Sequence, residues 1–193
     1  MKRILLLFLV LLALMLNACK TQTTEDLSKV QVSLHIDRFE KDLFSLDYNH
    51  IPDSIPELRK KYGEFFNLFV HKVVLLGNPD NPMFPEMLKS FITDYNMNIV
   101  NKEVARIFHS FDSINEIITP AFKRFHLFFP EKNIPHIYTY ISGFNQSIVT
   151  SDTLLGIGLD KYLGSNNDLY SRLGLSKYQK YNMYPGKIPA DCI

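Results

Sequence analysis

Apolar residues recur at three- and four-residue steps over most of the first half of the chain, which is the spacing of one face of an α-helix. The pattern is most regular between residues 55 and 76, where Ser54 and Glu57 also have capping-box spacing, and it predicts an amphipathic helix there. Further helices are expected at about residues 38–45, 84–94 and 104–111, and from Asp112, as N-cap, to about residue 125, with Pro120 kinking or interrupting the last one.

Shorter segments have the period of two that is typical of strands. Residues 30–36 alternate apolar and polar side chains and predict a half-buried strand. Residues 137–141 and 147–150 are rich in β-branched and aromatic residues and predict a hairpin-like pair, while residues 153–159 predict a third strand. The two glycines in the third strand indicate a bulge or a close backbone approach. Helices followed by a small antiparallel sheet and short helices make an α+β fold.

The first residues carry a different pattern. Two basic residues precede thirteen consecutive apolar residues, a run that suits an export signal and is too short to cross a bilayer comfortably. The run ends in Leu-Asn-Ala-Cys, which matches the pattern at which bacterial lipoproteins are cleaved and lipidated on the cysteine. We therefore predict a signal peptide at residues 1–18 and, on Cys19, a diacylglyceryl group and a further acyl chain such as palmitate. A lipidated flexible tether is expected at residues 19–29 and a single domain at residues 30–193. A cleaved leader with an incidental cysteine is the alternative.

Composition narrows the class of protein. The 193-residue chain has 21 basic and 20 acidic residues; without Lys2 and Arg3 the basic count falls to 19 and the formal charge to −1, so no nucleic-acid partner is expected. The two cysteines are Cys19 and Cys192, and lipidation of the first would leave the second without an intramolecular disulfide partner. Packing must then hold the domain together, and 15 Phe and 10 Tyr supply large side chains for it.

Short motifs for catalysis or cofactor binding are incomplete. No two of the six histidines have the i, i+4 spacing of a helical zinc site, and there is no H-E-x-x-H motif. Ser142 lacks the preceding glycine of the G-x-S-x-G nucleophile elbow. The segment from Gly156 begins like a dinucleotide fingerprint but has Lys161 at the third glycine position. We therefore predict no cofactor, no metal site and no catalytic residue, although distant residues can converge in a fold.

Asp152 and Asp160 flank the third predicted strand and could form a carboxylate pair for general acid–base chemistry. Turn and capping roles are favoured, since Ser-Asp is a turn dipeptide and Asp160 precedes an expected helix start. Nearby aromatic residues fit an interaction face and core packing equally well; they are Phe144, Tyr162, Tyr170, Tyr178, Tyr181 and Tyr184.

The last residues read as the start of a helix. Pro189 suits a first helical turn and Asp191 complements a helix N-terminus, yet the chain stops at Ile193. We favour a domain that is incomplete at its C-terminus over a short exposed tail.

The most specific sequence motifs lie between residues 125 and 185. They are Ile134-Pro135, Ser-Gly-Phe-Asn at 142–145, Gly-Ile-Gly-Leu-Asp at 156–160 and Tyr-Leu-Gly at 162–164. With the cysteine-ending leader and the segment HIDRFEKDLF at residues 35–44, these motifs resemble the gliding-motility-associated lipoprotein family GldB of Bacteroidetes. The resemblance covers most of the mature chain.

The resemblance implies an accessory lipoprotein of the cell envelope, functionally linked to the machinery that secretes and moves adhesins, and it supplies no known catalytic role. It also implies a remote likeness to metallopeptidase folds, in which a strand comparable to residues 153–159 borders a zinc-binding helix. That helix would begin after Pro189, and the family continues past Ile193 into a further helical region. The candidate interaction or structural motif comprises Phe144, Asn145, Asp152, Asp160 and Tyr162.

The leading hypothesis is a membrane-anchored, non-enzymatic accessory component of gliding motility and the linked secretion machinery, with envelope proteins of that apparatus as partners. The alternative is a zinc-peptidase-like enzyme whose metal-binding helix lies beyond this chain, and a general envelope structural protein is a third possibility. Lys20 after the lipidated cysteine, in place of aspartate, favours the periplasmic face of the outer membrane over the inner membrane.

Overall fold

The computed structural model describes residues 26–193. The predicted signal peptide, the lipid-attachment residue Cys19 and most of the predicted tether lie outside the described residues. The chain divides into two units, and the first ends at Val30. Its described part contains a single 3₁₀ turn, η1 (Leu27–Lys29), which begins where the carboxylate of Asp26 accepts a hydrogen bond from the Ser28 amide at 3.1 Å. The second unit, residues 31–193, contains the rest of the fold.

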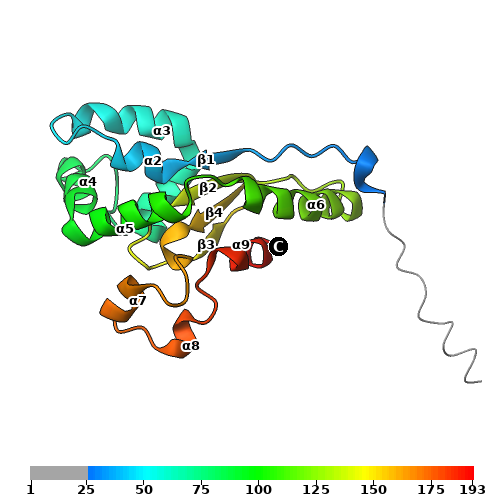
Figure 1. Ribbon diagram of the computed structural model, residues 1–193. Helices are drawn as coiled ribbons and strands as arrows, with labels where there is room; N and C mark the ends of the chain where they lie inside the picture. The colour runs from blue at the N-terminus through cyan, green and yellow to red at the C-terminus, as the bar shows by residue number, and fades with distance from the viewer. Residues whose placement is uncertain (1–25) are drawn as a thin grey trace, which may run out of the picture. The chain divides into compact units, whose positions relative to one another are not determined.

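The second unit begins with a strand, continues through helices and ends with three strands and short helical turns (Figure 1). The first half comprises β1 (Ile36–Arg38), α2 (Phe39–Phe44), α3 (Ile51–Leu68), the π-helical turn η2 (Phe69–Val73), α4 (Phe84–Thr93), α5 (Tyr95–Ile107) and α6 (Asp112–Phe128). The second half comprises β2 (His136–Tyr140), β3 (Ile148–Thr150), β4 (Leu154–Gly158), η3 (Leu159–Lys161), α7 (Asp168–Arg172), α8 (Lys177–Lys180), η4 (Pro185–Lys187) and α9 (Ile188–Asp191). This order confirms an α+β fold with a mostly helical first part.

The sheet is mixed and mostly parallel, so the predicted antiparallel sheet is wrong. Its strand order is β1-β2-β4-β3, with parallel β1–β2 and β2–β4 pairs and one antiparallel pair, β3–β4. The predicted hairpin between residues 137–141 and 147–150 does not form, because β2 pairs with β4 instead, placing Ile137 opposite Leu155. Local alternation shows that a segment is a strand but carries no information about its neighbour or direction, which burial against the helices decides.

The predicted first strand is much shorter than its pattern suggests. Only Ile36 of residues 30–36 belongs to β1, which continues to Arg38. Val32 and Leu34 nevertheless pack against the core as partly buried side chains. The alternation at residues 30–36 therefore predicted half-buried side chains correctly, although most of the segment does not pair with another strand.

The helices follow the predicted periodicity, with corrections at their ends. The helix expected to begin at residue 55 begins at Ile51, and the non-helical backbone of Gly63 (φ 48°, ψ −117°) kinks it. Pro120 lies inside α6 without ending it. Asp112 is the first residue of α6 rather than its N-cap, which is Phe111.

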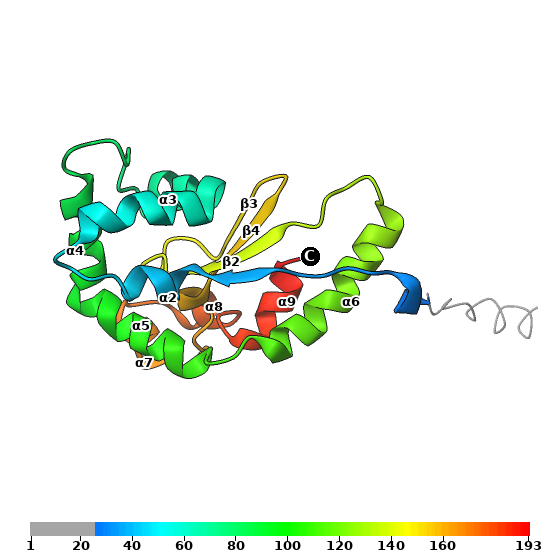
Figure 2. The same cartoon turned by 90° about the horizontal axis from the view of Figure 1, so that it is seen from above.

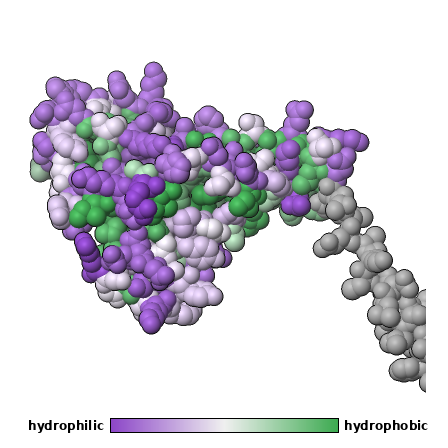
Figure 3. All heavy atoms as spheres, in the orientation of Figure 1, coloured by the Kyte–Doolittle hydropathy of each residue, from purple (hydrophilic) through white to green (hydrophobic). Residues whose placement is uncertain are grey.

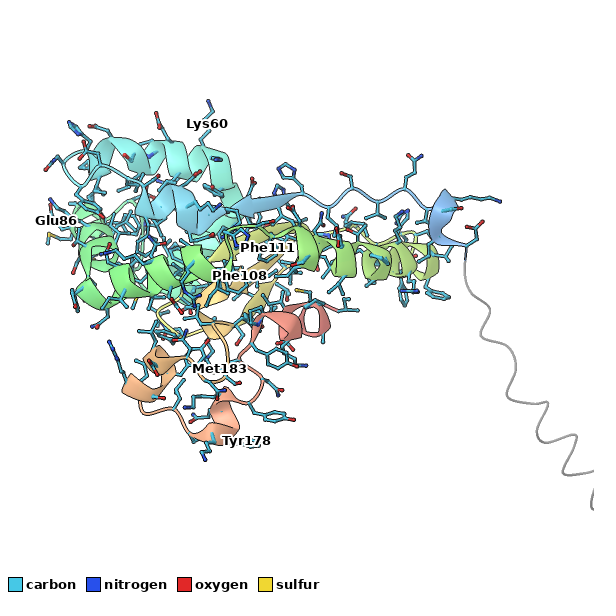
Figure 4. The ribbon with its side chains drawn as sticks, in the orientation of Figure 1. Lys60, Glu86, Phe108, Phe111, Tyr178 and Met183 are labelled. Carbon is cyan, nitrogen blue, oxygen red and sulfur yellow. The ribbon has the colours of Figure 1, made fainter. Side chains whose placement is uncertain are left out.

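The predicted helix at residues 104–111 ends early because its aromatic residues turn into the core. Helix α5 stops at Ile107, and Phe108 and Phe111 lie between α5 and α6 with ring centroids 6.1 Å apart (Figure 4). Both side chains are buried. Burial of these two rings between the helices replaces the additional helical turn that periodicity alone predicted.

Helices cover both faces of the sheet. Tyr140 and Leu154 belong to the hydrophobic cluster formed with α2, α3 and α4, whereas Ile137, Leu155 and Ile157 belong to the cluster formed with α5, α6 and α9. Figure 2 shows α3 on one side of the strands and α5 and α9 on the other. Because side chains alternate along β2 and β4, these strands contribute residues to both hydrophobic clusters. None of the helices between residues 26 and 193 combines the length and hydropathy needed to cross a bilayer.

A buried polar network joins β1, α2 and β2. Glu40 is 1% exposed, and its carboxylate accepts hydrogen bonds from Arg38 Nε at 2.6 Å and from Thr139 Oγ1 at 2.6 Å. Arg38 also donates to the Phe108 carbonyl at 2.9 Å and lies over the Phe111 ring, 5.6 Å from its centroid. The network ties Arg38 of β1 to a residue 70 positions away and Glu40 of α2 to one 99 positions away.

Close packing explains both glycines of β4: the predicted close backbone approach is found at Gly158, whereas Gly156 lies against side chains. A Cβ atom on Gly156 would lie 2.6 Å from Val149 Cγ2. A Cβ atom on Gly158 would collide with the Gln146 carbonyl oxygen and lie 3.0 Å from the Tyr140 ring. Side chains have no room at either position.

Gly158→Ala should therefore lower the free energy of unfolding by about 2 kcal/mol, because the backbone around Gln146 must shift to admit the methyl group. Urea denaturation of the full chain, followed by circular dichroism, measures the effect. Gly186→Ala is the matched control, since its Cβ would meet only the side chain of Tyr184, at 3.2 Å. Equal stability of the two variants would contradict the explanation.

Candidate functional site

Asp160 is the centre of a buried clamp. Its side chain is fully buried, and its carboxylate accepts hydrogen bonds from the Ser142 amide at 3.1 Å, from Ser142 Oγ at 2.9 Å and from the Phe144 amide at 2.5 Å. Burial raises the pKa of Asp160, and the hydrogen bonds from Phe144 and Ser142 oppose that rise. The favoured capping role of Asp160 is wrong: the carboxylate holds the loop that follows β2.

The loop held by Asp160 has a strained backbone. Gly143 and Phe144 both have positive φ values, 69° and 67°, and Phe144 is one of two non-glycine residues with positive φ among residues 26–193. The Phe144 ring packs edge-on against Tyr170 at 5.9 Å, and Asn145 donates to the Val73 carbonyl at 3.2 Å. The contacts fix a conformation that phenylalanine disfavours. Phe144 and Asn145 therefore stabilise this loop, whose Ser142 and Phe144 amides are already bonded to Asp160.

Tyr162 joins η3 to the last helix. It is 1% exposed, and its hydroxyl donates to Asp191 Oδ2 at 2.9 Å. Burial, followed by the hydrogen bond to Asp191, raises the pKa of Tyr162 far above its usual value, so the phenol remains protonated. Asp191 also pairs with Lys187 at 3.2 Å. The contact orients α9 rather than presenting a reactive hydroxyl.

Asp152 does not form a carboxylate pair with Asp160. The two residues lie beyond opposite ends of β4, Asp152 exposed in the turn from β3 and Asp160 buried in η3. A hydrogen bond from the Ser151 amide to the Leu154 carbonyl, 3.0 Å, closes that turn, so the turn role favoured for Asp152 agrees with the structure. The acid–base hypothesis for the pair is therefore wrong.

A groove of about 490 Å³ opens beside α6. Apolar side chains line it from three elements: Phe122 and Phe125 from α6, Leu154 and Leu155 from β4, and Cys192 after α9. Polar residues that also line the groove are Glu131, Lys132, Asn133, Thr150, Ser151 and Asp152. An apolar floor with polar groups beside it is the usual composition of a recognition site.

Cys192 in this groove is poorly suited to nucleophilic chemistry. Burial, and next the charge of Asp191, raise the pKa of the Cys192 thiol to about 12. The thiolate is the reactive form, and a thiol with this pKa is almost entirely protonated near neutral pH. The groove therefore favours binding over covalent catalysis.

Large apolar side chains are exposed along α6. Ile117 is 59% exposed and Phe128 61%, and eleven positions place them on the same helix face, with the groove residue Ala121 between them. Leu127 and Phe129 are also exposed. Figure 3 shows hydrophobic atoms along the visible face of α6. A cluster of this kind next to a groove marks an interaction surface more clearly than scattered exposed residues do.

The set of aromatic residues singled out in the sequence divides between core and surface. Tyr162 and Tyr170 are buried and Phe144 is half-buried, so these three pack in the interior. Tyr178 and Tyr181 are largely exposed, and Tyr184 is 41% exposed. They do not form one interaction face.

The sequence patterns did not reveal one cluster of possible metal ligands. His35, Asp37 and His136 come together at the start of β1 and β2, with potential ligand atoms within 4.8 Å of one another. Among residues 26–193 this group alone has metal-binding geometry of three or more His, Cys, Asp or Glu side chains. No motif could reveal it, because His35 precedes β1 and His136 begins β2, and only the parallel β1–β2 pairing brings them side by side.

These features define an α+β protein with a mostly parallel four-stranded sheet, a buried carboxylate clamp on the loop after β2 and an apolar groove beside α6. Residues 20–193 match the family described as gliding motility protein GldB, a lipoprotein family, and the chain belongs to that family. Membership makes it a gliding motility protein, as the resemblance implied. No curated protein and no solved structure matches the chain, so the remote likeness to metallopeptidase folds finds no support.

Proposed function

We propose that this protein is a membrane-anchored lipoprotein of the envelope that acts, without catalysis, as an accessory component of gliding motility and the linked secretion machinery. Family membership supports the motility role. The exposed apolar face of α6 beside the groove carries the proposal that its work is to hold a partner protein. The partner presents apolar side chains to the groove and polar groups to its borders.

The anchor is Cys19, lipidated after removal of residues 1–18, with residues 19–29 as the tether. Several acyl chains give stable anchoring, whereas one chain binds a bilayer only marginally. The domain then faces the periplasm, and the outer membrane is favoured over the inner one because Lys20, rather than aspartate, follows the cysteine. Anchoring confines the groove to a thin layer next to the membrane, which raises its effective concentration toward envelope partners.

The geometry of the groove supports a polypeptide partner. Phe122 and Phe125 form an apolar wall, and Lys132 and Asp152 place opposite charges near the opening. Apolar side chains entering such a groove supply binding energy, while charges at the border set specificity and orientation. The exposed Ile117 and Phe128 extend the apolar surface along α6.

Ile117→Glu and Phe128→Glu, introduced separately at the native locus, should reduce colony spreading to the level of a deletion strain. Each change places a charge where an apolar side chain would be buried against the partner, and such side chains each contribute about 2 kcal/mol or more to binding. Both side chains are exposed, so folding should be unaffected.

Tyr178→Glu is the control, because Tyr178 is 92% exposed on α8, apart from α6 (Figure 4). Immunoblotting and thermal denaturation confirm equal protein amount and stability. Wild-type spreading of both α6 variants, or an equal defect in the α8 variant, would refute binding through α6.

A further inference from the structure

The parallel β1–β2 pair places two histidines next to each other. Ile36 lies opposite Ile137, so His35 and His136 are the preceding neighbours on the two strands, and the Ile137 amide donates to the His35 carbonyl at 2.9 Å. Their rings meet edge to face with centroids 4.5 Å apart. The β1–β2 register therefore brings the rings of His35 and His136 close together.

Asp37 faces both imidazoles. His136 Nε2 lies 2.9 Å from Asp37 Oδ2, and His35 Nε2 lies 3.7 Å from Asp37 Oδ1. The same nitrogen of each ring thus points toward one carboxylate. Residues two apart in extended backbone point to the same face, so the cluster draws Asp37 from β1, His35 from the residue just before it and His136 from β2.

The position of the His136 ring is fixed by stacking. It lies parallel to the Tyr138 ring at 4.4 Å and 6°, and Tyr138 in turn stacks on Phe65 at 4.4 Å and 8°. Only the outermost ring, His35, is free to adjust, with its side chain 72% exposed. One held ligand and one adjustable ligand suit a site that closes when an ion arrives.

We propose that His35, Asp37 and His136 bind a divalent transition-metal ion, with Zn²⁺ as the best fit. Zinc takes imidazole nitrogen and carboxylate oxygen at about 2.0–2.2 Å, which separates adjacent tetrahedral ligand atoms by about 3.3–3.5 Å. The nitrogen–oxygen separations of 2.9 and 3.7 Å lie on either side of that value. The ligand atoms of the three residues all lie within 4.8 Å of one another, and the exposed His35 side chain has room to move.

The surrounding charges permit a cation. Lys61 of α3 is paired with Asp42 at 2.5 Å and its charge also acts on Asp37, while the Asp37 carboxylate is in direct contact with the two histidines. Zinc binds the unprotonated nitrogen, so each neutral ring carries its proton on Nδ1 when its Nε2 is a ligand. Three protein ligands leave one position for water, the composition of an open rather than a closed site.

Metal binding would cross-link β1 to β2, two strands whose facing side chains are 99 positions apart in the chain. The site is separate from the groove beside α6 and goes beyond the proposed function. It also differs from a helical H-E-x-x-H site, since its ligands come from two strands and the residue before one of them.

Isothermal titration of the full chain, purified in detergent without a histidine tag, with ZnCl₂ tests the site. One Zn²⁺ should bind per chain, and His35→Ala should weaken binding at least about 10-fold, since loss of even an outer-shell partner typically costs about 10–100-fold. His35 is exposed, so the variant should fold normally. Zinc should also raise the melting temperature of the wild type by about 5 °C, an increase that the variant loses.

His50→Ala is the matched control, because His50 is an exposed histidine that pairs with a single carboxylate, Asp47, at 2.8 Å. It should bind Zn²⁺ like the wild type. Tetrahedral Co²⁺ bands in the visible spectrum of the wild type and of His50→Ala, lost in His35→Ala, would support the same three ligands. No saturable binding, or equal affinity of wild type and His35→Ala, would overturn the proposal.

Discussion

Asp160→Ala should lower the free energy of unfolding by about 4 kcal/mol. The change removes the acceptor of the Ser142 amide, the Ser142 hydroxyl and the Phe144 amide, and each buried donor left unpaired costs about 1–3 kcal/mol. Relief of the cost of burying a carboxylate offsets part of this loss. The strained backbone of Phe144 also loses a contact that holds it. Urea denaturation of the full chain measures the difference.

Two further variants separate the clamp from simple loss of charge. Asp160→Asn keeps one acceptor oxygen, so it should fall between the wild type and Asp160→Ala. Asp152→Ala removes an exposed carboxylate from a turn and should change stability by less than about 0.5 kcal/mol. If Asp152→Ala cost as much as Asp160→Ala, the distinction between turn residue and clamp would be wrong.

Glu40→Ala should lower the free energy of unfolding by about 3–5 kcal/mol. Removing one partner of a buried ion pair leaves the other charge uncompensated, and Arg38 is only 15% exposed. The variant also leaves the buried Thr139 hydroxyl without its acceptor. Chemical denaturation with matched m-values for wild type and variant provides the measurement.

Asp80→Ala is the comparison for Glu40→Ala, because Asp80 forms an equally short pair with Arg59, 2.6 Å, on the surface. Its cost should stay below about 1 kcal/mol, since exposed pairs gain little in water. A similar loss in both variants would show that burial does not set the value of the Glu40 pair.

The sequence patterns predict the helices more accurately than the pairing of the strands. Apolar spacing located α3, α4 and α6 to within a few residues, because one face of each helix packs on the core and the spacing records that face. It gave β4 as well, and the glycines there signalled close approach. It missed the parallel pairing, because β2 reaches past β3 to join β4 and alternation has no direction.

The candidate site was only partly accessible from the sequence. Asp160 could be picked out as a carboxylate beside a strand, but its partners Ser142 and Phe144 belong to a loop 16–18 positions earlier. His35 and His136 are farther apart still, and each alone looks like an ordinary histidine. The groove beside α6 needs the tertiary arrangement of three elements, which no local pattern describes.

The long span between β1 and β2 determines the order in which this domain can be completed. The rings of Phe65 in α3 and Phe69 in η2 contact Tyr140 of β2, which comes far later in the chain. Until residues 136–158 are in place, β1 has no partner strand, and these two rings are covered by Phe39 of α2 but not by the sheet. The sheet therefore forms through contacts between distant parts of the chain, which slows folding relative to a domain built from local contacts.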